Sequence, residues 1–596
     1  MKRRIDSIGI PDFTRRRLLQ AAGGLFVLGA PNRMFGGGAA PGSPAVLSGT
    51  EFDLHIGFTP VNFTGRRRVA TVVNGQLPAP LLRWREGDTV TLRVRNDLHE
   101  RSSIHWHGMI VPADMDGVPG LSFEGIAPRE TYVYRFKVNQ HGTYWYHSHS
   151  RFQEQTGLYG PIVIEPRGGE RFPAERDYVV MLSDWTDIDP EHLFATLKKQ
   201  SNYFNRHRRT AAEFLDDVRE QGWGHTLRER RMWGDMRMDP TDLMDVSAYA
   251  YTYLMNGQTP GANWTALFSR GERVRLRFIN GSAMSIFDVR IPGLELRVVA
   301  HDGVDVEPVT VDEFRLGTAE TCDVIVTPSD DHAYTIFAQS LDRTGYARGT
   351  LAPRIGMQAE IPALDARPLL TMMDMGMAHG AAAHANHASA PGGNEHAGHG
   401  AHASAPAGRS VTHAHPVGPT VDMTVEQVST RLDDPGIGLR NNGRRVLTYA
   451  DLHTIGGPID SRAPEREIAL HLTGHMERFI WSFDGRKFSE APPIRLRYGE
   501  RVRITLVNDT MMTHPIHLHG MWSEIETPSG QFQVRKHTIL VHPAQQISYA
   551  VTADALGRWA YHCHLLYHME AGMFREVEVA DGHGPHSGHG AHGGHG

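Results

Sequence analysis

Residues 562–573 read HCHLLYHMEAGM, and this stretch decides how the rest of the chain is interpreted. It holds Cys563, one of only two cysteines, with His568 five positions and Met573 ten positions further on. A thiolate, an imidazole and a weak thioether are typical of blue-copper electron-transfer sites, because soft sulfur stabilises Cu(I) while imidazole tolerates Cu(II). Cys563, His568 and Met573 are therefore candidate ligands of a copper ion.

The two histidines beside this cysteine are expected to serve a second metal centre. Side chains alternate in direction along a strand, so His562 and His564 point to the face opposite Cys563. Three further clusters, HWHG, HSH and HPIHLHG, repeat the same spacing. The four pairs are His105 and His107, His147 and His149, His517 and His519, and His562 and His564. One such pair would be weak evidence, but eight imidazoles on four strands fit a cluster of three copper ions.

These clusters resemble the four copper-binding motifs of the multicopper oxidases. The resemblance implies four copper ions: one type 1, one type 2 and a type 3 pair. It implies these type 1 ligands: His514, Cys563, His568 and Met573. It implies these type 2 ligands: His105 and His517. It implies these type 3 ligands: His107, His147, His149, His519, His562 and His564.

The resemblance also implies a path for electrons and one for protons. Electrons would leave the type 1 copper through Cys563 and reach the cluster through the two flanking histidines. Asp116, in the stretch VPADMDGVP, occupies the position where related oxidases carry an acidic residue near the cluster. We therefore predict that Asp116 relays protons, and the alternative is an ordinary Asp-Gly turn residue.

Composition agrees with a turn-rich β protein. The 596 residues suffice for several domains, and 62 glycines and 35 prolines favour β-structure over helix bundles. A net charge of -6 with dispersed basic residues gives no indication of nucleic-acid binding. Two cysteines are too few for a disulfide framework, so Cys322 is interpreted as a small buried apolar residue.

An internal repeat predicts three β units. A turn at Asn74-Gly75, at Asn256-Gly257 and at Asp484-Gly485 is followed each time by a glycine and an alternating strand. We expect this strand to run on to the histidines in the first and third units, whereas the second unit has none. The trinuclear cluster should then lie between the outer domains, with the middle domain as a spacer and partial wall.

The predicted fold is all-β, with three cupredoxin-like Greek-key β-sandwich domains, a disordered Met/His-rich linker and a His-rich C-terminal tail. The predicted boundaries are 1–45 for a signal and leader, 46–170 for domain 1, 171–365 for domain 2, 366–420 for the linker, 421–580 for domain 3 and 581–596 for the tail.

The first residues are predicted to be an export signal. Arg15 and Arg16 lie in TRRRLLQ, which has the twin-arginine pattern, and the apolar run AAGGLFVLGA follows at 21–30. This run is too short to span a bilayer in the mature protein. We therefore expect export by the twin-arginine pathway to the periplasm, signal cleavage and no stable membrane insertion.

Two segments depart from the regular architecture because they have few large apolar residues. The linker histidines are His379, His384, His387, His396, His399, His402, His413 and His415. The tail histidines are His583, His586, His589, His592 and His595. Spaced histidines on a mobile chain suit opportunistic metal binding, and the alternative is a merely solubilising segment.

Methionine placement points to the substrate. The first group is Met232, Met236, Met238 and Met244, and the second is Met372, Met373, Met375 and Met377. Thioethers prefer Cu(I) to Cu(II). Interspersed aspartates and arginines argue against a packed apolar face, although methionine is ordinarily core filler. Both groups are predicted to handle Cu(I).

Several stretches narrow the resemblance to the copper resistance protein A (CopA-type) branch of the family. These are the leader, RMDPTDLMDV, MDMGM, RLDDPGIGLRNNGRRVLTYADL and HCHLLYHMEAGMFR. The resemblance implies a periplasmic oxidase that converts Cu(I) to Cu(II) and reduces dioxygen to water, with a periplasmic copper chaperone as a further partner. The alternatives are a laccase-like phenol oxidase and a non-catalytic copper-sequestering protein.

Overall fold

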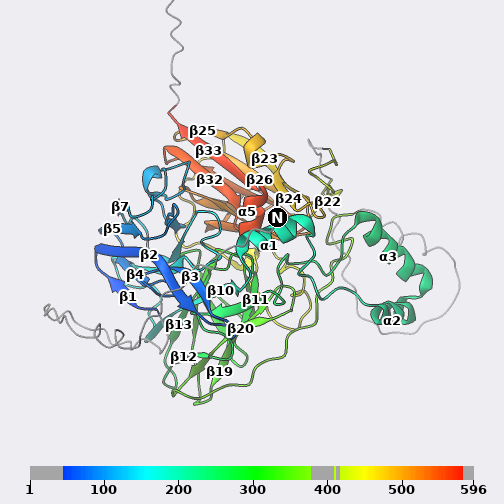
Figure 1. Ribbon diagram of the computed structural model, residues 1–596, viewed down its shortest axis with the longest axis horizontal. Helices are drawn as coiled ribbons and strands as arrows, with labels where there is room; N and C mark the ends of the chain where they lie inside the picture. Colours follow the sequence, from blue (N-terminus) through cyan, green and yellow to red (C-terminus); the bar gives the residue numbers. More distant parts are fainter. Residues whose placement is uncertain (1–43, 378–408, 411–415, 582–596) are drawn as a thin grey trace, which may run out of the picture. The chain divides into compact units, whose positions relative to one another are not determined.

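The computed structural model describes residues 44–377, 409–410 and 416–581 (Figure 1). The predicted leader, the His-rich part of the linker and the Gly/His tail lie outside the described residues. All described residues belong to one compact unit.

The first β-sandwich pairs the sheet β3-β2-β5-β7 with the sheet β1-β4-β9-β8-β6. Its strands are β1 (Val46–Ser48), β2 (Glu51–Val61), β3 (Arg68–Val73), β4 (Leu81–Arg85), β5 (Thr89–Asn96), β6 (His105–His107), β7 (Thr131–Lys137), β8 (Gly142–His147) and β9 (Tyr159–Glu165). Its core is made by residues from both sheets, such as Leu54, Val90, Trp106 and Ile162.

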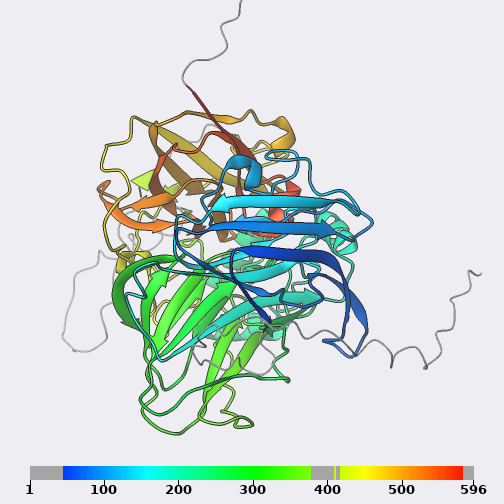
Figure 2. The ribbon, with the colours of Figure 1, turned by 90° about the vertical axis from the view of Figure 1, so that its left-hand side faces the viewer.

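The second β-sandwich pairs β11-β10-β13-β18-β15-β16 with β12-β20-β19-β14-β17 (Figure 2). Its strands are β10 (Arg176–Thr186), β11 (Tyr251–Met255), β12 (Trp264–Leu267), β13 (Val274–Asn280), β14 (Phe287–Arg290), β15 (Leu296–His301), β16 (Val304–Val311), β17 (Glu313–Leu316), β18 (Thr321–Val326), β19 (Tyr334–Ser340) and β20 (Tyr346–Ala352). Cys322 is fully buried in β18, as expected.

The third β-sandwich pairs β24-β23-β26-β31-β28-β29 with β25-β33-β32-β27-β30. Its strands are β23 (Arg466–His475), β24 (Ile480–Phe483), β25 (Ile494–Arg497), β26 (Arg501–Asn508), β27 (His514–Leu518), β28 (Ser523–Glu526), β29 (Phe532–Lys536), β30 (Thr538–Val541), β31 (Gln546–Thr552), β32 (Gly557–Cys563) and β33 (Phe574–Ala580). A small ladder joins β21 (Arg409–Ser410) to β22 (Gln427–Val428).

The predicted repeat is present in the three-dimensional structure. Each domain contains an equivalent parallel strand pair: β2 with β5, β10 with β13, and β23 with β26. Both residues of each predicted turn have positive φ, at Asn74-Gly75, Asn256-Gly257 and Asp484-Gly485. Two successive positive φ values are characteristic of type I′ turns, for which Asn-Gly and Asp-Gly are the preferred pairs.

The expectation that the repeated strand runs on to the histidines is wrong. β5 ends at Asn96 and β26 ends at Asn508, and the histidines begin new strands in the opposite sheet. The cause is a fully buried asparagine that binds the backbone around the corner. Asn96 Nδ2 donates to Glu100 O and Ile126 O (2.7 and 2.8 Å), and Oδ1 accepts from Leu98 N (3.0 Å). Asn508 turns the third domain in the same way.

Helices interrupt the middle domain, which the all-β prediction did not include. They are α1 (Pro190–Lys199), α2 (Ala211–Gln221) and α3 (Trp223–Met236), which lie between β10 and β11 (Figure 1). Asp189 caps α1 ahead of Pro190, and Thr210 with Glu213 forms a capping box on α2. In the described ranges no helix has the length and apolar character needed to cross a membrane.

The first and middle domains touch through glycine backbones. Gly142, at the start of β8, has φ of +118°, and a Cβ there would lie 2.1 Å from Gly303 O. Thr321 Oγ1 donates to Thr143 O beside this contact (3.1 Å). Close approach of the two backbones therefore requires glycine at position 142.

We predict that Gly142→Ala lowers the thermal midpoint, because the methyl group must displace the Gly303 backbone. The expected cost is about 1–3 kcal/mol, as for other overpacked sites. Gly168→Ala is the control, since nothing lies within 4 Å of a Cβ at that position. Equal midpoints for the two variants in differential scanning calorimetry would contradict the role of this contact.

Candidate metal centre

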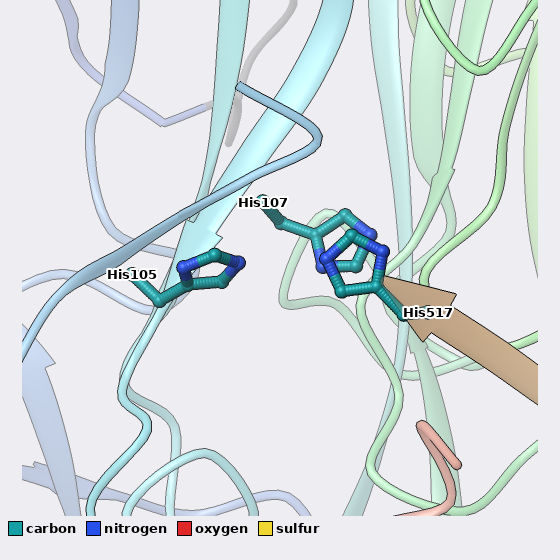
Figure 3. Close-up of side chains that lie close together, drawn as sticks. All are labelled: His105, His107 and His517. Atoms are coloured by element: carbon teal, nitrogen blue, oxygen red, sulfur yellow. The ribbon is translucent and has the colours of Figure 1, made fainter. Parts of the chain in front are cut away.

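The eight paired histidines converge between the first and third sandwiches. In the first domain, β6 pairs with β8 so that His105 lies opposite His147. In the third domain, β27 pairs with β32 so that His517 lies opposite His562. The two sets meet ring to ring, and the His107 and His517 rings stack at 3.9 Å (Figure 3).

The imidazole nitrogens form three groups, and within each group they lie within 4.8 Å of one another. The groups are His107, His147 and His564; His149, His519 and His562; and His105, His107 and His517. Each of these groups draws on both outer domains. The arrangement matches three neighbouring metal positions, each with nitrogen donors.

The free ring nitrogens indicate that these residues fit a metal. Five buried ring nitrogens at the centre of this cluster have no hydrogen-bond partner: Nε2 of His105, His147, His517 and His564, and Nδ1 of His107. Leaving a buried polar atom without a partner is costly, so five in one place point to ligands. The other nitrogen of several rings is anchored, for example His517 Nδ1 to His537 O (2.5 Å). Such anchoring fixes the ring orientation of metal ligands.

Burial favours the neutral form of seven of these rings, which is the form that binds metal. It lowers the pKa of His562 to about 4. Burial also lowers the pKa of the ring well below its usual value at His107, His147, His149, His517, His519 and His564.

Two buried carboxylates contact the histidine cluster. Asp116 Oδ2 accepts from His519 Nδ1 (2.8 Å), and Asp116 O accepts from His105 Nδ1 (2.7 Å). Asp116 therefore touches one histidine from each outer domain, while its predicted proton-relay role stays a prediction. Glu154 Oε2 lies 2.7 Å from His147 Nδ1. Sequence reasoning missed Glu154, although it lies in the same loop as His149 and only five positions after it.

The second candidate site gathers around Cys563. His514 Nδ1 lies 3.5 Å and His568 Nδ1 lies 3.9 Å from Cys563 Sγ, and the two Nδ1 atoms are 3.2 Å apart. Met573 is fully buried, and its backbone binds Cys563 N and His568 O. Burial raises the pKa of the Cys563 thiol, so a bound cation is needed to stabilise the thiolate.

The His568 ring is sealed from solvent. Its face stacks on Trp481 at 3.9 Å, and its exposed fraction is 0%. Its Nε2 lies 2.7 Å from Asp245 Oδ2, which comes from the middle domain. Burial raises the pKa of Asp245 to about 7. Sequence reasoning missed Asp245, although it directly follows Met244 in a segment singled out for its methionines.

The predicted methionine groups divide by exposure. In the first group Met232 is 41% exposed, Met236 and Met238 are partly buried against the core, and Met244 is in the core. In the second group Met373 is 62% exposed, Met372 and Met377 are partly buried, and Met375 is in the core. Packing therefore accounts for Met244 and Met375, while a role of either group in binding Cu(I) stays a prediction.

A cavity of about 410 Å³ reaches one histidine of the cluster. His149 lies in its wall together with apolar side chains such as Leu121, Phe488 and Phe574. Its wall also carries Lys487 and Glu570, so a cavity of mixed polarity leads to the histidine cluster at this place.

Comparisons with known proteins agree with this geometry. Family models described as multicopper oxidase match residues 55–169, 176–354 and 461–583. A copper resistance protein A homolog of Pseudomonas syringae pv. tomato is 62% identical over 555 residues, which is 91% of this chain and 94% of the relative. Copper resistance protein A of Escherichia coli is 60% identical over 570 residues, which is 90% of this chain and 94% of the relative.

A solved structure shares the fold at low identity. Fet3p, a multicopper oxidase that functions in iron import, aligns with a TM-score of 0.61 and 18% identity, covering 89% of this chain and 90% of that chain. The predicted three-domain cupredoxin architecture is thereby confirmed. The chain belongs to the multicopper oxidase family and is a close homologue of copper resistance protein A.

Proposed function

We propose that this multicopper oxidase oxidises Cu(I) to Cu(II) and couples that reaction to the four-electron reduction of dioxygen to water. The observation that carries the proposal is the burial of His568 behind Asp245, in a loop that also contains the partly buried Met238. A small cation can be bound by such carboxylates and thioethers. Copper resistance would follow from removal of the more permeant Cu(I).

The resident copper ions are assigned as the family's motifs imply. His514, Cys563, His568 and Met573 would hold the type 1 ion, and His105 and His517 the type 2 ion. The six remaining histidines of the cluster would hold the type 3 pair. When bound, these ions supply one-electron redox chemistry and the site at which dioxygen is reduced.

The chain's own residues connect the two centres and handle protons. Cys563 is bonded directly to His562 and His564, and each of these histidines belongs to a different group of the cluster. The covalent path between the sites is therefore only a few bonds long. Asp116 Oδ2 is placed to exchange a proton beside the His519 ring.

The second candidate is a laccase-like phenol oxidase, which the surroundings of His568 favour less. A bulky phenol needs contact with an exposed edge of the type 1 site, but His568 and Trp481 are 0% exposed. A non-catalytic copper-sequestering protein would need neither the Cys563 site nor eight converging imidazoles. The cuprous oxidase is therefore our preferred function.

The proposed compartment is the periplasm. The twin-arginine pattern at Arg15 and Arg16 supports export, and the relatives named for copper resistance agree with a role in copper handling. A periplasmic copper chaperone is our proposed source of Cu(I).

We predict that Cys563→Ser removes the visible thiolate-to-copper absorption and abolishes turnover with every donor, because the thiolate is both ligand and electron conduit. Cys322→Ser is the matched control, since Cys322 is the other buried cysteine and lies in β18. Absorption spectra and oxygen consumption of the copper-loaded proteins would be measured. Oxidase activity retained by folded Cys563→Ser protein would refute the assignment.

We also predict that changing Met232, Met236 and Met238 together to leucine weakens the use of Cu(I). Leucine keeps the apolar volume while removing the sulfur donors, so the fold should suffer little. The apparent KM for Cu(I) should rise roughly tenfold, equivalent to about 1.4 kcal/mol. The rate with a phenol should fall less.

Met255→Leu serves as the packing control, because Met255 is fully buried in β11. Oxygen consumption with limiting Cu(I) separates the variants. Equal apparent KM values for the parent and the triple variant would show that these methionines are ordinary packing.

A further inference from the structure

The middle domain holds none of the predicted ligands of the four resident copper ions. One of its carboxylates nevertheless reaches the surroundings of the histidine cluster. Asp302 lies in the turn between β15 and β16 and is fully buried. Its Oδ2 accepts from two successive backbone groups of the third domain, His537 N (3.2 Å) and Thr538 N (3.1 Å). Its Oδ1 accepts from Thr321 N (3.1 Å), which ties the carboxylate to its own domain.

Asp302 binds the dipeptide His537-Thr538, and this dipeptide orients two predicted ligands from different domains. His537 O accepts from His517 Nδ1 (2.5 Å). His537 Nδ1 and Thr538 Oγ1 each lie 3.2 Å from His107 Nε2. These contacts leave His517 Nε2 and His107 Nδ1 free and buried. The dipeptide therefore selects which nitrogen each ring presents, and the choice is opposite in the two rings.

A buried cation holds Asp302 in its charged form. Lys536 Nζ lies 3.0 Å from Asp302 Oδ2, 2.8 Å from Glu320 Oε1 and 2.8 Å from His301 Nδ1. The Lys536 side chain is 0% exposed. Burying such an ion pair contributes little net stability, because desolvation offsets the attraction. Its effect here is to fix the position of Asp302 and, through it, of residues 537–538.

We propose that Asp302, supported by Lys536, is a positioning residue of the trinuclear centre, so that the middle domain sets the orientation of His107 and His517. This inference rests on the proposed assignment of His107 and His517 to the trinuclear centre. Asp302 touches neither copper ligand. It binds the backbone of residues 537–538, and its Oδ2 lies 3.7 Å from His537 Nδ1, the atom that contacts His107 Nε2. Removing a group that orients a metal ligand typically lowers metal affinity or activity roughly 10- to 100-fold.

The test uses the full-length, copper-loaded protein with Asp302→Ala and Asp302→Asn. The control is Asp323→Asn, because Asp323 is a buried carboxylate in β18 that pairs with Arg277 (3.0 Å) and forms no hydrogen bond or ion pair with residues 537–538. Copper content, the type 1 visible absorption and the type 2 electron paramagnetic resonance signal are measured. Thermal midpoints of the metal-free proteins report on folding.

We expect Asp302→Ala to keep the type 1 absorption while the type 2 signal changes and the copper per chain falls. Asp302→Asn retains one carbonyl acceptor and should show a smaller change of the same kind, which keeps the test decisive if the alanine variant does not fold. An unchanged type 2 signal in Asp302→Asn and in folded Asp302→Ala, or a change equal to that of Asp323→Asn, would overturn the proposal. Absence of type 2 and type 3 signals from the parent would instead overturn the trinuclear assignment itself.

Discussion

The rest of the structure depends on burying ring nitrogens that have no protein partner. At the histidine cluster this concerns Nε2 of His105 and His147 among others. Burying such atoms is costly unless a metal completes them, so each ring must be held from behind. Asp116, Glu154 and the carbonyl of His537 do this for four of the rings. Burial against solvent and anchoring from outside are thus two parts of one requirement.

The pairing of the histidines could be predicted from the sequence because strand alternation is a local rule, whereas their assignment as copper ligands stays a prediction. It places His105 with His107 and separates Cys563 from its flanking histidines without knowledge of the fold. The corner asparagines were missed even though Asn96, Asn280 and Asn508 recur at the same place in each unit. The helices α1 to α3 were missed, although α1 buries Leu193 and Leu197 four positions apart and α2 begins with a capping box.

The supporting contacts could not be predicted from the sequence, because they join distant parts of the chain. Asp245 and His568 are 323 positions apart, and Asp302 and His537 are 235 positions apart. No periodicity links such residues, since their proximity follows from how three sandwiches pack. The same packing changes the expected role of the middle domain. It is not only a spacer, because its side chains contact the third domain near both predicted copper sites.

The Cys563 site and the histidine cluster differ in what covers them. His568 is closed by Trp481 and a middle-domain loop, so under the proposed function electrons would enter through a contact such as Asp245. His149 instead lies in the wall of a cavity formed by the first and third domains. A small molecule can reach the cluster there without passing the middle-domain loop that contains Asp245. His149 and Asp245 belong to different domains, so under the proposed function the Cu(I) donor and dioxygen would be selected at separate places. The short covalent path through Cys563 would then carry electrons from one place to the other.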